Sequence, residues 1–277
     1  MICNKLGFPF PDQIHIKILK YSILATTIVR NNNTTHPQPN MSTGSRTLLD
    51  LAKVSPEIFT LRPDYRALLL IVSNIPPGPS DAQSEALLQS AENSARTALA
   101  QTSVTDIPHV AAWRDTYKAF GAKPKKDRSS LESLLRRTEG GLPRVNRLTD
   151  IYNAMSVKYQ IPFGSEDLDK YVGAPVLVRA TGKEAFETTA AGEKITENPP
   201  VGEAVWCDDE GITCRRWNWR QCSRTGISDA TTRVLFILDA LEPCSDENLE
   251  AAAEELTQVL KGLSPDVSAE RRLIRAA

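Results

Sequence analysis

Arginine and tryptophan are concentrated in one short stretch of this chain, residues 211–221. The stretch holds three arginines and two of the chain's four tryptophans, with an asparagine between them: Arg215, Arg216, Trp217, Asn218, Trp219 and Arg220. Planar guanidinium groups grip phosphate, and flat indole rings stack on bases. This combination of residue types therefore favours a site that binds a nucleotide or another flat anion.

We predict that Gly211–Trp219 is a strand. Because side chains alternate between the faces of a strand, both indoles would share one face with Arg215, and Arg216 would lie on the other. A second interpretation stays open, in which the strand is half buried and only exposes its arginines to solvent. Arginine is rarely buried without a partner, so the stretch by itself favours this second interpretation over a ligand site.

A second group of polar residues shares one face of a predicted helix. The helix covers Val145–Tyr159, and Asn146, Asp150 and Asn153 follow one another at steps of four and three residues. Asparagine and aspartate are poor helix formers, so three of them in line are unusual. Solvent exposure explains them, and so does a polar site or a buried hydrogen-bond network next to Val157. Both explanations remain open.

The charges of the chain are unevenly distributed. The formal net charge is −1 over 277 residues, which gives no overall signature of nucleic-acid binding. Between Arg114 and Arg147, however, ten basic residues face only four acidic ones, and arginine again prevails between Arg215 and Arg233. Basic surface of this kind favours a polyanionic partner.

Metal binding and disulfides are not expected. The five cysteines lack the spacing of metal ligands, their odd number argues against a full disulfide framework, and the chain has only three histidines. We therefore predict no metal and no cofactor, in a reducing compartment. No apolar run reaches the length of a membrane span, so we expect no membrane partner.

Residues 1–40 have a composition of their own. They carry four basic residues against one acidic residue and end in an Asn/Thr/Pro-rich run. We predict a disordered or dispensable extension before Met41 and a cytoplasmic protein. Acid-poor, hydroxyl-containing sequence is also typical of a transit peptide, so mitochondrial import is the alternative.

The remaining elements predict an α+β fold of mixed α/β layers, with a central β-sheet and flanking helices. The apolar runs Tyr65–Ser73 and Arg233–Ala240 are typical of buried strands. Asp81–Gln101, Val110–Phe120 and Asp246–Gly262 have helical spacing of their apolar residues. Shorter elements complete the prediction: a helix at Arg46–Val54, a helix from Ser129 or Ser130 to Arg137, and strands at Ala174–Ala180 and Val201–Cys207. We place one domain at 41–265 and a C-terminal tail at 266–277.

Several motifs resemble a known family. Val145–Asn153 followed by Ile161–Lys170 is similar to the B3/B4 domain of the bacterial phenylalanyl-tRNA synthetase beta subunit. The chain resembles still more closely the free-standing proteins built from this domain. Those proteins share a Gly-x-x-Pro loop, a Ser-Ser-x-Glu-x-Leu-x-Arg-Arg helix and a Cys-Arg-Arg-Trp-Asn-Trp-Arg-Gln strand, here Gly121–Pro124, Ser129–Arg137 and Cys214–Gln221.

The resemblance implies a tRNA-binding protein that hydrolyses the ester of mischarged tRNA, acting in trans as an editing deacylase. The synthetase domain has a histidine in a Pro-x-His-Ala-Phe-Asp segment, and the matching residue here is Gly164. A histidine base is therefore not expected, and the amino-acid specificity of the family does not carry over. The neighbouring ribose hydroxyl of the ester can assist hydrolysis in its place.

The resemblance also suggests a role for each candidate residue. Asn146, Asp150 and Asn153 would position the water or the amino group, and Glu166 and Asp167 would receive the substrate's ammonium. Arg215, Arg216 and Asn218 would contact phosphate or the oxyanion, and Trp217 or Trp219 would stack on the terminal adenine. Arg136 and Arg137 would contact tRNA. The plainer roles of these residues are helix-end charges for the arginines, and capping and turn formation for Asp167.

We expect the polar helix face and the Arg/Trp stretch to line one shared cleft, with the basic loop Lys123–Arg128 near its mouth. Two other functions remain open. One is a non-catalytic module that binds tRNA or a small ligand on the same fold. The other is a metabolic enzyme or interaction protein that uses the fold for an amino-acid-like ligand.

Overall fold

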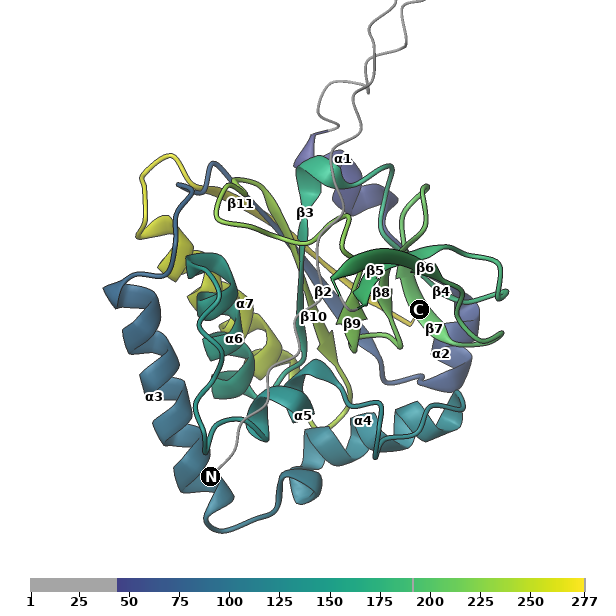
Figure 1. Cartoon of the computed structure of the whole chain (residues 1–277), viewed down its shortest axis with the longest axis horizontal. Helices are drawn as coiled ribbons and strands as arrows, with labels where there is room; N and C mark the ends of the chain where they lie inside the picture. The colour runs from purple at the N-terminus through teal and green to yellow at the C-terminus, as the bar shows by residue number, and fades with distance from the viewer. Residues whose placement is uncertain (1–43, 191, 277) are drawn as a thin grey trace, which may run out of the picture. The chain divides into compact units, whose positions relative to one another are not determined.

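A four-stranded antiparallel sheet lies at the centre of the computed structural model, in the order β11–β2–β10–β3 (Figure 1). The structure describes residues 44–190 and 192–276, which belong to one compact unit. The predicted extension at 1–40 lies outside these residues. The strands of the central sheet are β2 (Arg66–Ser73), β3 (Phe163–Asp167), β10 (Val234–Ala240) and β11 (Ser268–Arg275).

Strands β2 and β10 are apolar because both of their faces are covered. Alternate residues of β2 point to opposite sides, so Leu68 and Leu70 belong to one apolar cluster and Leu69 and Ile71 to another. The first cluster packs against helices and the second against a further sheet. The expected buried strands at Tyr65–Ser73 and Arg233–Ala240 are thus confirmed.

Helices cover one face of the central sheet. Residues of α6 (Arg147–Tyr159) and α7 (Asp246–Lys261) pack on it, and α3 (Ala82–Leu99) lies outside α6 (Figure 1). Each helix begins where a polar side chain accepts a hydrogen bond from a backbone N–H of its first turn, as expected for an N-cap. The caps are Asp81 for α3, Asn146 for α6 and Ser245 for α7.

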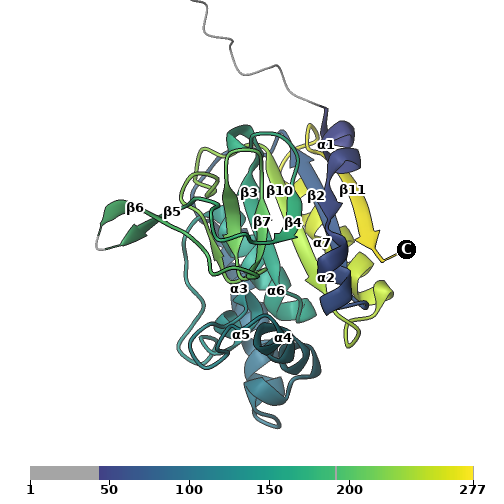
Figure 2. The same cartoon turned by 90° about the vertical axis from the view of Figure 1, so that its right-hand side faces the viewer.

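The opposite face of the central sheet packs on a five-stranded sheet in the order β1–β4–β7–β8–β9. Helices α1, α2 and α4 border these layers, and the β5–β6 hairpin extends away from the two larger sheets (Figure 2). The bounds are β1 Lys53–Val54, β4 Val176–Arg179, β7 Ala204–Cys207, β8 Ile212–Arg215, β9 Arg220–Gln221, β5 Phe186–Ala190, β6 Glu193–Glu197, α1 Ser45–Leu51, α2 Pro56–Leu61, α4 Pro108–Ala119 and α5 Ser130–Leu135. Short 3₁₀ turns lie at Val104–Asp106 and Leu168–Lys170. Layers of helices and sheets confirm the predicted α+β class.

Two expectations about segments are corrected. Residues 266–277 are not a tail, because Ser268–Arg275 pairs along the whole of β2 as an edge strand of the central sheet. Gly211–Trp219 is not one strand either. The strand ends at Arg215, and the chain reverses through Arg216 and Trp217, whose φ angles are 47° and 67°.

Candidate functional site

The turn between β8 and β9 is held by one buried carboxylate, that of Glu203. Its oxygens accept hydrogen bonds from Nε of Arg215 at 2.8 Å and from the backbone N–H of Arg216 at 3.2 Å. Glu197, which lies at the rim, pairs with Arg215 at 2.7 Å from its Nη1. Buried charges need such partners, and non-glycine residues at positive φ persist only where their surroundings hold them. The pair therefore fixes the turn, and Arg215 is structural.

The side chains of the turn go to different places. Trp217 is fully buried, with its ring centroid 4.8 Å from that of Tyr65 and 5.4 Å from that of Trp113, both edge-on. Asn218 accepts a hydrogen bond from the Tyr117 hydroxyl at 3.0 Å and donates one to Asp239 at 3.3 Å. Trp217 is thus part of the core, contrary to its expected stacking role.

Trp219 differs from Trp217 because it stays half exposed and lines a cavity. The guanidinium carbon of Arg216 lies 3.9 Å from its ring centroid, which places a cation over one face of the indole. Arg216 also faces Asp127 at 3.1 Å and Glu203 at 3.5 Å. It therefore supports the indole from behind and lies outside the cavity, in a small separate pocket beside Lys123.

The cavity has a volume of about 560 Å³ and opens where the edges of the two larger sheets meet. The β3 edge and the β9 edge are linked there by a hydrogen bond from the Gln221 amide to the Ser165 carbonyl. Helices α5 and α6 close the other sides. Its apolar and aromatic walls are Leu134, Pro143, Val145, Tyr152, Phe163 and Trp219, with Gly164 and Cys214 at its base.

The polar groups of the cavity are cationic or neutral. They are Ser130, Ser133, Arg137, Thr149, Asn153, Asn218, Arg220 and Gln221. Among the described residues that line it there is no aspartate, glutamate or histidine. Burial raises the pKa of the Cys214 thiol well above its ordinary value, so this group is neutral too. The cavity therefore favours an anion and lacks an ordinary general base.

Several of these groups have no partner within the part of the chain that the structure describes. The Arg137 guanidinium forms neither an ion pair nor a hydrogen bond there, whereas Arg136 next to it pairs with Glu132 at 2.9 Å. The Ser130 hydroxyl is buried without a hydrogen bond, and none is formed by the Asn153 side chain, which is 6 % exposed. Buried polar groups are normally hydrogen-bonded, so these atoms are available for a ligand or water.

Helix α6 brings only one of its three predicted residues into the cavity. Asn153 lines it, as expected. Asn146 is the N-cap of the helix and accepts from the Thr149 N–H at 2.8 Å. Asp150 is fully buried and accepts from the Val145 N–H at 2.9 Å and from the Ser80 hydroxyl. Asn146 and Asp150 therefore organise the loop before α6 and are not placed to act on a ligand.

Glu166 and Asp167 are not free to receive an ammonium group. Both lie in β3 and are buried. Glu166 accepts from the Thr225 hydroxyl, and burial raises its pKa to about 8, so it is mainly protonated at neutral pH. Asp167 accepts from the Thr231 hydroxyl at 2.9 Å and pairs with Lys170 at 2.9 Å. Hydroxyls from a distant loop satisfy these two carboxyl groups, which the local sequence did not indicate.

The shared cleft is thus only partly as predicted. Of the residues expected there it contains Asn153, Asn218 and Trp219, but not Asn146, Asp150, Arg215, Arg216 or Trp217. Arg137 also lines it, and Arg136 does not. The basic loop Lys123–Arg128, which was expected near its mouth, contributes no residue to its lining. Sequence reasoning missed Tyr152, Gln221 and Glu203. For Tyr152 a signal was present, because it directly precedes Asn153 on the predicted helix.

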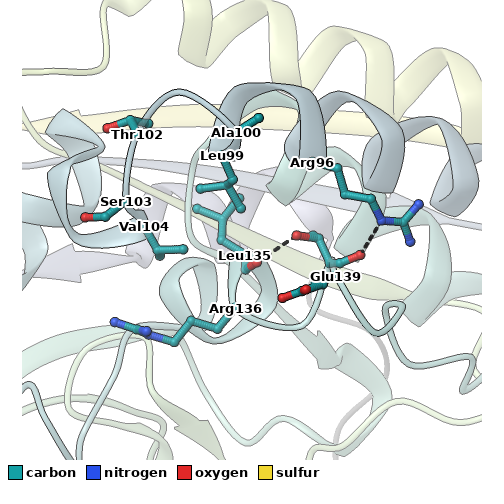
Figure 3. A pocket seen from close by; sticks show the side chains of 10 residues that line it. Arg96, Leu99, Ala100, Thr102, Ser103, Val104, Leu135, Arg136 and Glu139 are labelled. Atoms are coloured by element: carbon teal, nitrogen blue, oxygen red, sulfur yellow. Dashed lines mark hydrogen bonds between the residues drawn. The ribbon is translucent and has the colours of Figure 1, made fainter.

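A second cavity of about 540 Å³ lies between the end of α3 and the end of α5 (Figure 3). Its arginines are already engaged, since Nε of Arg96 donates to the Thr138 carbonyl at 2.8 Å and Arg136 pairs with Glu132. Leu99 and Leu135 belong to the apolar cluster beneath it. This cavity offers less unpartnered polar surface than the first, so we take the first as the candidate site.

In the described ranges, no three His, Cys, Asp or Glu side chains are grouped so that they could hold a metal ion. None of the helices described is both long and apolar enough to cross a membrane.

Comparison with known proteins shows the family of the chain. The family model of the B3/4 domain matches residues 112–267, more than half of the chain, and the protein therefore belongs to the B3/4 domain family. The resemblance drawn from the sequence motifs is thus confirmed. A search of curated proteins finds no match.

Among solved structures, the chain is similar to an N-terminal fragment of the phenylalanyl-tRNA synthetase beta subunit from Pyrococcus horikoshii, with 11 % identity and a TM-score of 0.38. The overlap covers 80 % of this chain and 49 % of that one. The chain therefore spans about half the length of that structure.

Proposed function

We propose that this protein binds the acylated 3′ end of tRNA in the cavity beside Trp219 and hydrolyses the ester in trans. The observation that carries the proposal is the set of groups that meet there. Two guanidiniums without a carboxylate partner, a half-exposed indole and unpartnered amide and hydroxyl groups surround one cavity. Phosphate, a base and an acyl ester are the chemical parts of a tRNA end that these groups recognise.

Each group has a role in this proposal. Arg137 binds a phosphate of the 3′ end, and the terminal adenine stacks on the exposed part of the Trp219 indole. Asn153 and the Ser130 hydroxyl hold the attacking water and the ester carbonyl. Water adds to the acyl carbon, the bond to the ribose oxygen breaks, and that oxygen takes up the proton. Because the described lining has no acid or imidazole, the neighbouring ribose hydroxyl relays the proton.

The test of binding uses two adjacent arginines. Arg137→Ala should weaken tRNA binding several-fold and reduce the slope of log affinity against log salt by about 1, because one phosphate contact is lost. Arg136→Ala is the matched control, since that guanidinium is paired with Glu132 and lines the other cavity. Equal losses in the two variants would contradict the assignment of the cavity as the tRNA site.

A second function, binding without hydrolysis, is favoured by one observation, the absence of a general base among the described lining residues. Single-turnover deacylation of a panel of acylated tRNAs separates the two. Under the proposal the protein speeds ester loss, and Asn153→Ala slows it with little change in tRNA affinity. If tRNA binds in the cavity and no ester is hydrolysed faster than in buffer, the protein is a binding module.

A further inference from the structure

The charge of the cavity walls restricts which acyl group can enter. Arg137 and Arg220 line the cavity, and neither forms an ion pair with a described residue. The described lining has no carboxylate to balance them. A positively charged group brought into this space would lose its hydration and meet two like charges at close range.

Two buried carboxyl groups that contact lining residues do not compensate. Glu166 is bound to Thr225 and is mainly protonated near pH 7, because burial raises its pKa to about 8. Asp239, behind the Asn218 amide, accepts from the Tyr65 hydroxyl at 2.6 Å and from that amide at 3.3 Å. Both groups are buried in the core and engaged by other side chains.

Apart from Arg137, the unpartnered polar groups of the cavity are neutral. The Ser130 hydroxyl, the Ser133 hydroxyl and the Asn153 amide offer donors and acceptors without charge. Such groups satisfy a hydroxyl or an amide of a ligand well, but an ammonium group gains most from a charged acceptor.

We propose that the acyl group accepted by this cavity is uncharged at its α-position. The substrate class is then an ester of an N-acylated amino acid or of a 2-hydroxy acid on the 3′ ribose, in preference to an aminoacyl ester with a free amine. This inference rests on the proposed function and names its substrate class.

Three hydrolysis-resistant probes test this proposal. Each is 3′-amino-3′-deoxyadenosine with a phenylalanyl, a phenyllactyl or an N-acetylphenylalanyl group on the 3′ nitrogen, so that an amide replaces the ester. The phenylalanyl and phenyllactyl probes have nearly the same size and differ only in that the first carries an ammonium group where the second carries a hydroxyl. Calorimetric titration at pH 6.5, where an α-amine of ordinary pKa about 7.7–8 is charged, gives the affinities. We expect the two uncharged probes to bind about tenfold more tightly than the phenylalanyl probe.

Two variants locate the cause. Asn153→Asp places a carboxylate on the wall and should raise the affinity for the phenylalanyl probe about tenfold, which removes the preference. Asn146→Asp is the matched control, because position 146 caps α6 outside the cavity and aspartate also caps helices. It should leave the preference unchanged, and thermal unfolding checks that both variants fold.

The outcomes separate the two proposals. Equal or tighter binding of the phenylalanyl probe by the unmodified protein overturns the inference and leaves the proposed function standing. Failure of all three probes to bind overturns the proposed function and the inference with it. A folded Asn153→Asp protein that keeps the full preference shows that the charge of the wall is not its cause, and this also overturns the inference.

Discussion

Replacing Glu203 with glutamine tests whether one buried carboxylate holds the turn that presents Trp219. Glutamine keeps an oxygen that can accept a hydrogen bond but removes the charge that faces Arg215 and Arg216. The Glu203 side chain is 4 % exposed and that of Arg215 is 5 % exposed, so the remaining guanidinium stays buried with only Glu197 at its rim.

The expected cost follows from this burial. Removing one partner of a buried ion pair costs about 3–5 kcal/mol, and we expect a loss near 3 kcal/mol because Glu197 still pairs with the guanidinium. In a domain of this size, that corresponds to a melting temperature lower by roughly 6–12 °C. Affinity for tRNA should fall as well, since Arg216 also supports the indole of Trp219.

Glu197→Gln provides the matched control. This carboxylate lies 2.7 Å from the same guanidinium, but its side chain is 36 % exposed, so solvent screens the pair and its loss should cost less than about 1 kcal/mol. Urea unfolding of the three proteins at pH 7 gives both values. Added salt should reduce the small effect of Glu197→Gln and leave that of Glu203→Gln nearly unchanged. Equal costs in the two variants would refute the role assigned to Glu203.

Three further predictions concern the core and the cavity. Between pH 6.5 and 8 the free energy of unfolding of the unmodified protein should fall by about 2 kcal/mol more than that of Glu166→Gln. The folded-state pKa of Glu166 is raised from 4.5 to about 8, so the stability that its protonated form provides is lost as pH rises toward that value. Equal falls in the two proteins, measured by urea unfolding at both pH values, would contradict this. Trp217→Ala should cost about 3–5 kcal/mol of stability, whereas Trp219→Ala should cost clearly less and weaken tRNA binding. A larger loss of stability in Trp219→Ala than in Trp217→Ala would show that the roles assigned to the two indoles are wrong. Gly164→Ala should change stability by less than about 1 kcal/mol, since an added Cβ would meet Ile237 at an ordinary 3.9 Å; a large loss on thermal unfolding would show a tighter base of the cavity.

The long elements were predictable because their signals are local. The apolar run of β2 and the heptad-like spacing of α7 each report burial without knowledge of the partner. The capping residues Asp81 and Ser245 also follow from short-range rules, because a cap bonds to the backbone three residues away. Family membership was predictable in the same way, from motifs in continuous segments.

The candidate site was only partly predictable because its geometry depends on distant residues. Asn153 and Trp219 were predicted to share a cleft, and they line the same cavity. Strand β3 was missed because its polar residues, Glu166 among them, are satisfied by threonines some sixty residues further along the chain.

The amino-acid sequence by itself determined the α+β class of this protein, its long helices and buried strands, and the family to which it belongs. Tertiary structure alone decided what the Arg/Trp stretch does. Strand periodicity treats Trp217 and Trp219 as equivalent, but Glu203 reverses the chain at Arg216, so one indole enters the core and the other lines the cavity. A buried carboxylate twelve residues before its arginine partner leaves no mark in the local pattern, and it is this long-range ion pair that separates the structural residues from those free to bind a ligand.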